Sequence, residues 1–290
     1  MQDIFQKACL LQLCIKVWTG AKKLDPIYME HLGQSDWLKG RKHLIDPEYL
    51  SPIKTTAGKA RAFVKKHALP FPINGLQLVP KDSISYIESN LLEYEHMFSS
   101  DLRRLLSVFD DAVANARMVL GDLFDPLDYP QDLKSRFGFS WQYVQLSLPG
   151  QHSVLSPELY QREKDKFIEL MDRTRQEAVL ALRQEFSELV GNLSDRLTSS
   201  GRPKVLRSSM LDKMNEFLEG FGNRNVFADD QLQELVDNAR QVINTVDIQS
   251  LKSDESLRES IQQSMESIKD EVDKAIEDAP RRKIVLKEAV

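Results

Sequence analysis

Apolar residues recur every three or four positions over about forty residues in the middle of the chain, and this pattern constrains the fold more than any other feature. The positions are Ile84, Ile87, Leu91, Tyr94, Phe98, Leu102, Leu105, Phe109, Val113, Ala116, Leu120 and Leu123. Their mean step of about 3.55 residues lies near the heptad period of coiled coils. The pattern therefore predicts one helix over residues 82–124, about 60 Å long.

A second long periodic segment begins after Ser156 and Pro157, which suit the N-cap and the first position of a helix. Its apolar positions run from Phe167 to Leu197 along one face, so we expect a helix over residues 157–199. The simplest packing of two such helices is a long antiparallel helical hairpin, or coiled coil, that pairs this helix with the first one.

Three shorter helices are expected in the C-terminal part, over residues 204–219, 229–244 and 254–278. The last of them carries a short heptad seam. Its members are Ile261, Met265, Ile268 and Val272.

Three segments alternate apolar and polar residues with a period of two, over residues 11–17, 75–79 and 137–148. They predict a small three-stranded sheet, whereas residues 21–50 look irregular and polar. The fold class is therefore mainly α with some β (α+β). We expect three regions, which are a basic N-terminal region over 1–81, the long-helix hairpin with an inserted strand over 82–200, and a helical region over 201–290.

Charge is distributed unevenly, because residues 1–81 hold 13 Lys and Arg against 6 Asp and Glu, while the whole chain has a net charge of −5. The densest basic cluster consists of Lys22, Lys23, Lys39, Arg41 and Lys42. Basic residues with aromatic neighbours can hold a nucleic acid backbone. The same cluster could equally contact the acidic C-terminal half or another subunit, so both interpretations stay open.

No catalytic motif is visible in the sequence. The stretch around Gly58 and Lys59 superficially resembles a phosphate-binding loop, but the first glycine would fall at Ile53 and Ala60 replaces the required Ser or Thr. We interpret this stretch as an ordinary helix with a basic face formed by Lys54, Arg61 and Lys65. The five histidines are scattered and form no metal-binding spacing. We therefore expect no cofactor, no metal and no enzymatic activity.

The longest uncharged apolar stretch is far shorter than the roughly 20 residues that a membrane-spanning helix needs. The N-terminus also lacks the basic start and the small-residue cleavage site of a signal peptide. These features predict a cytoplasmic protein without a membrane partner.

Three short motifs carry a resemblance to a known family. They are Trp18-Thr19-Gly20-Ala21-Lys22-Lys23-Leu24, Asp46-Pro47-Glu48-Tyr49-Leu50 and Phe137-Gly138-Phe139-Ser140-Trp141-Gln142-Tyr143-Val144. They resemble an uncharacterised family of proteins of about this length, carried by bacteriophages, plasmids and conjugative elements. Members are often encoded near a MoxR- or cobaltochelatase-type AAA+ ATPase, and some near single-strand annealing recombination genes. The resemblance covers residues 5–150 best and brings no catalytic residues with it.

Two functions follow as hypotheses. The first is a non-enzymatic interaction or assembly protein of a mobile genetic element, which self-associates and can partner an AAA+ ATPase. Its expected assembly seam comprises Leu102 and Phe109 together with the four heptad positions of residues 254–278. The alternative is a DNA-associated accessory protein, for recombination or maintenance, that uses the basic N-terminal region.

Overall fold

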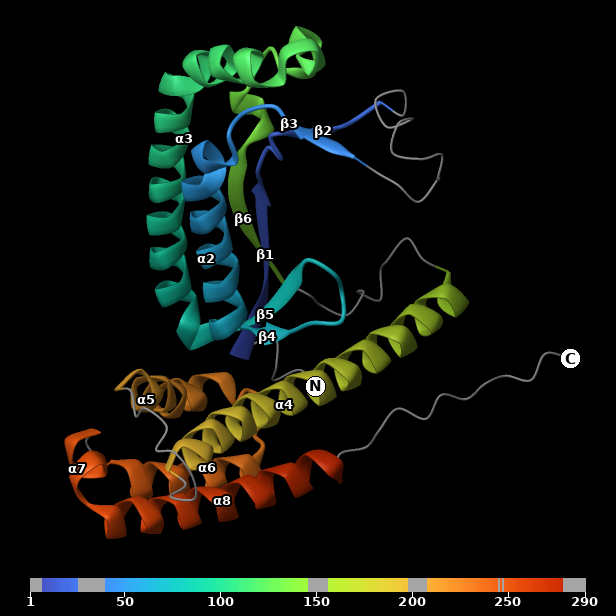
Figure 1. Cartoon of the computed structure of the whole chain (residues 1–290). Helices are drawn as coiled ribbons and strands as arrows, with labels where there is room; N and C mark the ends of the chain where they lie inside the picture. The colour runs from blue at the N-terminus through green and yellow to red at the C-terminus, as the bar shows by residue number, and fades with distance from the viewer. Residues whose placement is uncertain are drawn as a thin grey trace, which may run out of the picture. The chain divides into compact units, whose positions relative to one another are not determined.

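The computed structural model describes residues 7–25, 40–145, 156–197, 208–244, 246 and 248–278. The fold is mainly helical with a small β component, as the sequence predicts. The helices are α2 (Ser51–His67), α3 (Ile84–Leu120), α4 (Pro157–Leu197), α5 (Ser208–Arg224), α6 (Asp230–Ile243), α7 (Ile248–Ser253) and α8 (Glu255–Glu277). The strands are β1 (Ala8–Lys16), β2 (Ala21–Lys23), β3 (Arg41–His43), β4 (Leu69–Pro70), β5 (Leu76–Pro80) and β6 (Gly138–Val144). Figure 1 shows these elements along the chain.

The chain divides into two compact units. The N-terminal unit comprises Leu11–Lys66 and Ser83–Val144, and the C-terminal unit comprises Met1–Leu10, His67–Asp82 and Gln145–Val290. This division differs from the three expected regions, because α3 belongs with the N-terminal residues and α4 with the C-terminal helices. The expected hairpin of 82–124 with 157–199 is therefore not the long-helix pair of this fold.

Strands β4, β5, β1 and β6 form a four-stranded sheet in that order. The three predicted strands are confirmed as β1, β5 and β6, and residues 146–148 of the last prediction lie outside the described residues. Strand β4 is added by an antiparallel pairing with β5 in which Leu69 lies opposite Leu78. The prediction of an irregular stretch over residues 21–50 is wrong in part. Strands β2 and β3 form a separate two-stranded ribbon there, and a short 3-10 helix covers Pro47–Leu50.

The N-terminal unit is built around helices α2 and α3, which lie side by side in Figure 1. Thr56 of α2 donates a hydrogen bond from Oγ1 to Oδ2 of Asp101 in α3, at 3.0 Å. The predicted helix over 82–124 is confirmed as α3, and a 3-10 turn follows from Gly121. The N-terminal unit has a hydrophobic core, whose buried residues are Ile45, Leu50, Ile53, Ala57, Phe98, Leu105, Ala112, Leu133 and Phe137. The apolar stripe of α3 therefore packs within the N-terminal unit.

Aromatic residues of β6 continue this packing. The ring of Phe139 lies 5.5 Å from that of Phe98 and 6.0 Å from that of Trp141. The indole Nε1 of Trp141 donates to Oε2 of Glu88 at 2.8 Å, and the Tyr143 hydroxyl donates to the same oxygen at 3.0 Å. A single carboxylate of α3 thus fixes two side chains of the strand.

Helices α4 and α8 form the long pair of the C-terminal unit. Arg183 of α4 reaches Ala275, Ser187 reaches Asp273, and a Cβ added to Gly191 would lie 3.0 Å from Lys269. Positions rise along α4 as they fall along α8, so the two helices are antiparallel. The predicted helices of this part are confirmed as α4, α5, α6 and α8, with the short α7 added.

Candidate functional site

The register of the β2–β3 ribbon sorts the basic cluster into two sets. Lys22 lies opposite Lys42, and Lys23 lies opposite Arg41, in an antiparallel pairing. Directly opposed residues share one face of a ribbon, and successive residues alternate between its faces. One face therefore carries Lys22 and Lys42, and the other carries Lys23 and Arg41. The fifth residue of the cluster, Lys39, lies outside the described residues.

The first face is tied to the N-terminal unit by Asp128, whose side chain is almost fully buried. Lys22 forms an ion pair with Asp128, and Lys42 Nζ lies 2.6 Å from Asp128 Oδ2. Lys42 Nζ also donates to the carbonyl oxygen of Leu123 at 2.5 Å. These two cations are therefore structural, although the Lys22 side chain is still 55% exposed. Lys23 and Arg41, on the other face of the ribbon, are exposed as well.

The pKa values of this cluster follow from its geometry. Burial of the Asp128 carboxyl opposes its ionisation, but the ammonium groups of Lys22 and Lys42 outweigh that effect, and the pKa of Asp128 lies below its ordinary value. The hydrogen bond to Asp128 raises the pKa of Lys22. The pair is consequently charged at neutral pH.

The loop over residues 125–129 contacts the ribbon face that carries Lys22 and Lys42, and hydrogen bonds hold the loop in place. Asp125 accepts a hydrogen bond on Oδ1 from the backbone N–H of Leu127 at 2.9 Å. The Tyr129 hydroxyl donates to the carbonyl oxygen of Leu44 at 2.6 Å, and its ring lies 5.4 Å from that of Phe124. Yet the side chain between these anchors, Leu127, is 88% exposed.

The residues expected to form an assembly seam are instead packed within the chain. Leu102 and Phe109 are half-buried against the hydrophobic core of the N-terminal unit. The four heptad positions of α8 are buried inside the C-terminal unit, and these are Ile261, Met265, Ile268 and Val272. The four positions of α8 are therefore core positions and offer no exposed seam. At Leu102 and Phe109, which are only partly covered, the assembly seam stays a prediction.

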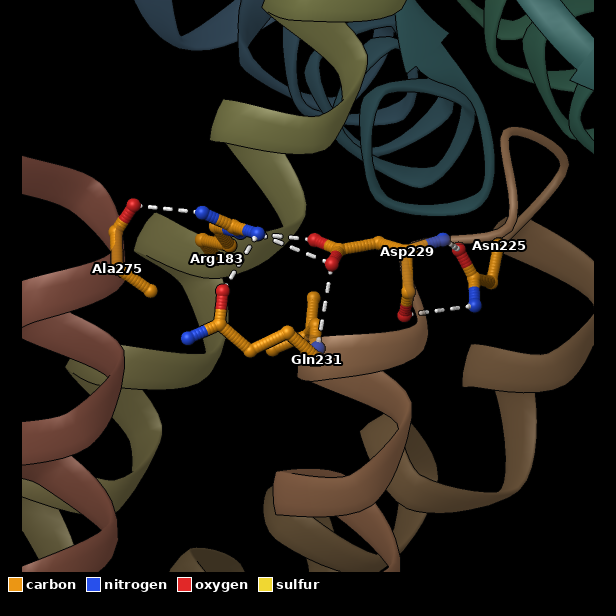
Figure 2. Close-up of polar contacts among 6 residues, drawn as sticks. Arg183, Asn225, Asp229, Gln231 and Ala275 are labelled. Carbon is orange, nitrogen blue, oxygen red and sulfur yellow. Dashed lines mark hydrogen bonds and ion pairs between the residues drawn. The ribbon is translucent and has the colours of Figure 1, made fainter. Parts of the chain in front are cut away.

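A buried ion pair in the C-terminal unit was not predicted from the sequence. Figure 2 shows Arg183 of α4 facing Asp229, with Nε–Oδ2 at 2.7 Å and NH2–Oδ1 at 3.0 Å. Arg183 also donates to the carbonyl oxygen of Ala275 in α8 at 2.5 Å. Asp229 in turn caps α6 by accepting from the backbone N–H of Leu232 at 3.2 Å. One arginine thus joins α4, α6 and α8.

A second buried arginine repeats this arrangement. Arg224 of α5 donates to both carboxylate oxygens of Glu185 in α4, at 3.1 and 2.5 Å. Its guanidinium carbon lies 5.8 Å from the centre of the Phe217 ring. Pairs 39 and 46 residues apart leave no local sequence signal, so only the fold brings these partners together. Both ion pairs connect helices of the C-terminal unit.

Three further features bear on whether the described residues could carry chemistry. Gly58 and Lys59 lie in the middle of α2, so the stretch is a helix and offers no phosphate-binding loop. Among the described residues, no group of three His, Cys, Asp or Glu side chains could hold a metal ion. An open groove of about 600 Å³ runs between α6 and α8. Its polar lining consists of Asn238, Gln241, Gln263, Ser264, Ser267 and Glu271.

None of the described helices combines the length and the apolar character that crossing a membrane requires. The chain belongs to a family described as proteins of unknown function (DUF3150), whose family model matches residues 5–270. This match confirms that the chain falls in an uncharacterised family. Searches of curated proteins and of solved structures found no match.

Proposed function

We propose that this chain is a non-enzymatic interaction protein of a mobile genetic element, which associates with itself and with an AAA+ ATPase in the cytoplasm. The mobile-element setting and the ATPase rest on the resemblance carried by residues 18–24, 46–50 and 137–144. The interaction itself rests on one structural observation, an apolar tip on the N-terminal unit.

The apolar tip consists of Met118, Val119 and Leu127, whose side chains are 77%, 77% and 88% exposed. These are the largest exposures among the big apolar residues of the described chain. Met118 and Val119 lie in the last turn of α3, and Leu127 lies on the loop that Asp125 and Asp128 hold in place. Single exposed apolar residues are common, but three within ten positions are unusual for a surface without a partner.

The tip suits binding because Asp125 and Asp128 hold the backbone on which Leu127 stands. A backbone that is already ordered loses little conformational entropy when a partner covers it. An interface of standard size buries about 800 Å² on each partner, so the tip would serve as the apolar centre of a larger contact with a polar rim. A second copy of this chain is the first partner that we propose, and the ATPase is the second.

Light scattering on the full chain at micromolar concentrations tests this proposal. We expect the wild type to exceed its monomer mass of 33.3 kDa or to retain a MoxR-type AAA+ ATPase in a pull-down. The double variant Met118→Ser with Leu127→Ser should lose both properties and keep its thermal unfolding midpoint. As a separate check, the purified wild-type chain should show no ATP turnover that the substitution Lys59→Ala abolishes.

The matched control replaces two exposed apolar residues away from the tip, Tyr49→Ser with Ile73→Ser. It should associate as the wild type does. A wild type that stays monomeric and binds no ATPase would contradict the proposal, and so would a tip variant that still associates normally.

A further inference from the structure

The outer face of α2 carries an unusual concentration of positive charge. The helix Ser51–His67 contains five Lys and Arg residues and no Asp or Glu. The whole chain holds 39 Lys and Arg against 44 Asp and Glu, so the residues outside α2 have a net charge of −10. The five cations of α2 are Lys54, Lys59, Arg61, Lys65 and Lys66, and all are exposed.

The helical repeat arranges these cations in two rows. Lys54, Arg61 and Lys65 lie within one narrow arc of the helix, and Lys59 and Lys66 lie together about 120° around it. The residues between the two rows are small and exposed, and these are Thr55, Gly58 and Ala62. A Cβ built on Gly58 would meet nothing within 4 Å. The face is therefore a shallow trough with basic edges.

The opposite side of α2 holds this face in place. Ile53, Ala60 and Val64 are at most 1% exposed, so the helix is anchored along its length. Arg61 NH2 donates to the carbonyl oxygen of Ile15 at 2.9 Å, which fixes one cation of the first row. Thr56 bonds to Asp101 on the buried side.

Three of the five cations keep their charge uncompensated. Within the part of the chain that the structure describes, no carboxylate pairs with Lys54, Lys59 or Lys65. By contrast, Lys22 and Lys42 of the ribbon are both paired with Asp128. The field of the trough therefore reaches solvent, where it attracts a partner of high negative charge density.

We propose that the outer face of α2 binds the phosphate backbone of double-stranded DNA without reading its sequence. Along a row, the cations are spaced by about 6 to 10 Å, which corresponds to about two or three steps of a strand that rises 3.4 Å per nucleotide. The small residues of the trough let a sugar-phosphate strand approach the helix closely. This activity goes beyond the protein partners proposed for the apolar tip.

Other occupants fit this face less well. A protein interface needs apolar or aromatic anchors, and the exposed face of α2 offers only Ala62 as an apolar side chain. A membrane-surface helix needs an apolar side to insert, whereas the apolar side of α2 is buried in the core. Single strands are held largely by aromatic stacking, and no aromatic residue is exposed on this helix.

Fluorescence anisotropy with a labelled DNA duplex of mixed sequence tests the proposal on the full chain. Wild type should bind at low salt, with affinity that falls as salt rises because bound counterions are released. The triple variant Lys54→Gln, Lys59→Gln and Lys65→Gln should weaken binding about tenfold or more at low salt. It should also reduce the slope of log affinity against log salt by about 2.7, which is about 0.9 for each lost phosphate contact.

The matched control removes the same amount of charge from exposed positions of the C-terminal unit, in Arg175→Gln, Lys213→Gln and Lys274→Gln. It should bind nearly as the wild type does, and both triple variants should keep the wild-type thermal midpoint. No salt-dependent binding by the wild type would overturn the proposal. Equal losses in the two triple variants would overturn it too, because the effect would then follow net charge alone. Mass measurements on the α2 variant separate this outcome from a failure of the apolar tip.

Discussion

The two units of this protein use their charged residues differently. In the C-terminal unit, Arg224 is buried and Arg183 is largely buried, and both join helices through bidentate ion pairs with Glu185 and Asp229. In the N-terminal unit, the cations of α2 stand in solvent on a helix without acidic residues. Asp128 draws Lys22 and Lys42 of the ribbon into a structural contact. The comparison teaches that net charge by region does not locate a binding surface, because pairing decides which charges remain available.

The largest expected effect is on the buried pair of the C-terminal unit. Asp229→Ala would leave the guanidinium of Arg183 buried without its carboxylate and would remove the cap of α6. We expect a loss of about 3–5 kcal/mol in the free energy of unfolding of that unit. Urea titration by far-UV circular dichroism should show it. Arg173→Ala, which breaks the exposed pair with Glu177, should cost less than about 0.5 kcal/mol.

Tryptophan fluorescence sharpens this comparison. The chain has three tryptophans, of which Trp37 lies outside the described residues and is replaced by Phe in both proteins that are compared. The other two, Trp18 and Trp141, belong to the N-terminal unit. Their transition in urea should therefore move little in Asp229→Ala while the helical signal shifts. A fluorescence transition that moves by the same amount would show that the two units unfold together.

A smaller effect is expected from the core of the N-terminal unit. Phe109 is half-buried, and its ring lies 5.9 Å from that of Trp18. Phe109→Asp would place a charge in this packing, and we expect it to cost about 2–4 kcal/mol. Met118→Asp on the same helix should change the stability by less than about 0.5 kcal/mol, because that side chain is 77% exposed. Equal thermal unfolding midpoints for Phe109→Asp and Met118→Asp would mean that α3 does not bury the face that carries Phe109.

Removing the contact between Asp128 and the β2–β3 ribbon should have the smallest effect on stability, and that effect should depend on pH. Asp128→Asn would remove the shared partner of Lys22 and Lys42, at a cost of about 1–3 kcal/mol. The pKa of Asp128 is lower in the folded chain than in the unfolded one, so its contribution is present at neutral pH. That contribution is lost as the pH falls through the lowered pKa, below about pH 4.

Thermal unfolding measured between pH 7 and pH 3 tests this sign. The difference between wild type and Asp128→Asn should shrink towards acid pH. A difference that stays constant would show that the carboxylate charge does not hold the ribbon.

The sequence predicted those parts of the fold that depend on repeated local patterns. The stripe of α3 and the heptad positions of α8 extend over many turns, so their periodicity stands out. The ribbon was missed because strands of three residues are too short to show alternation. Its pairing also depends on Asp128, which lies 106 residues from Lys22.

The helix pairing was missed for a related reason. An apolar stripe predicts that a helix is covered, but it does not say by what. The stripe of α3 packs within the N-terminal unit, and α4 packs against α8. The basic face of α2 was visible in the sequence at Lys54, Arg61 and Lys65, but its significance required the burial of the other side and the pairing of Lys22 and Lys42.

Lysine reactivity, measured by acetylation and mass spectrometry with and without a DNA duplex, tests the central claim most directly. Without DNA, Lys42 should react slowly because it is largely buried beside Asp128, whereas Lys54, Lys59, Lys65 and Lys213 should react quickly. Adding the duplex should protect the three α2 lysines and leave Lys213 unchanged. Fast reaction of Lys42, together with equal protection of the α2 lysines and Lys213, would contradict the division between structural and available charge.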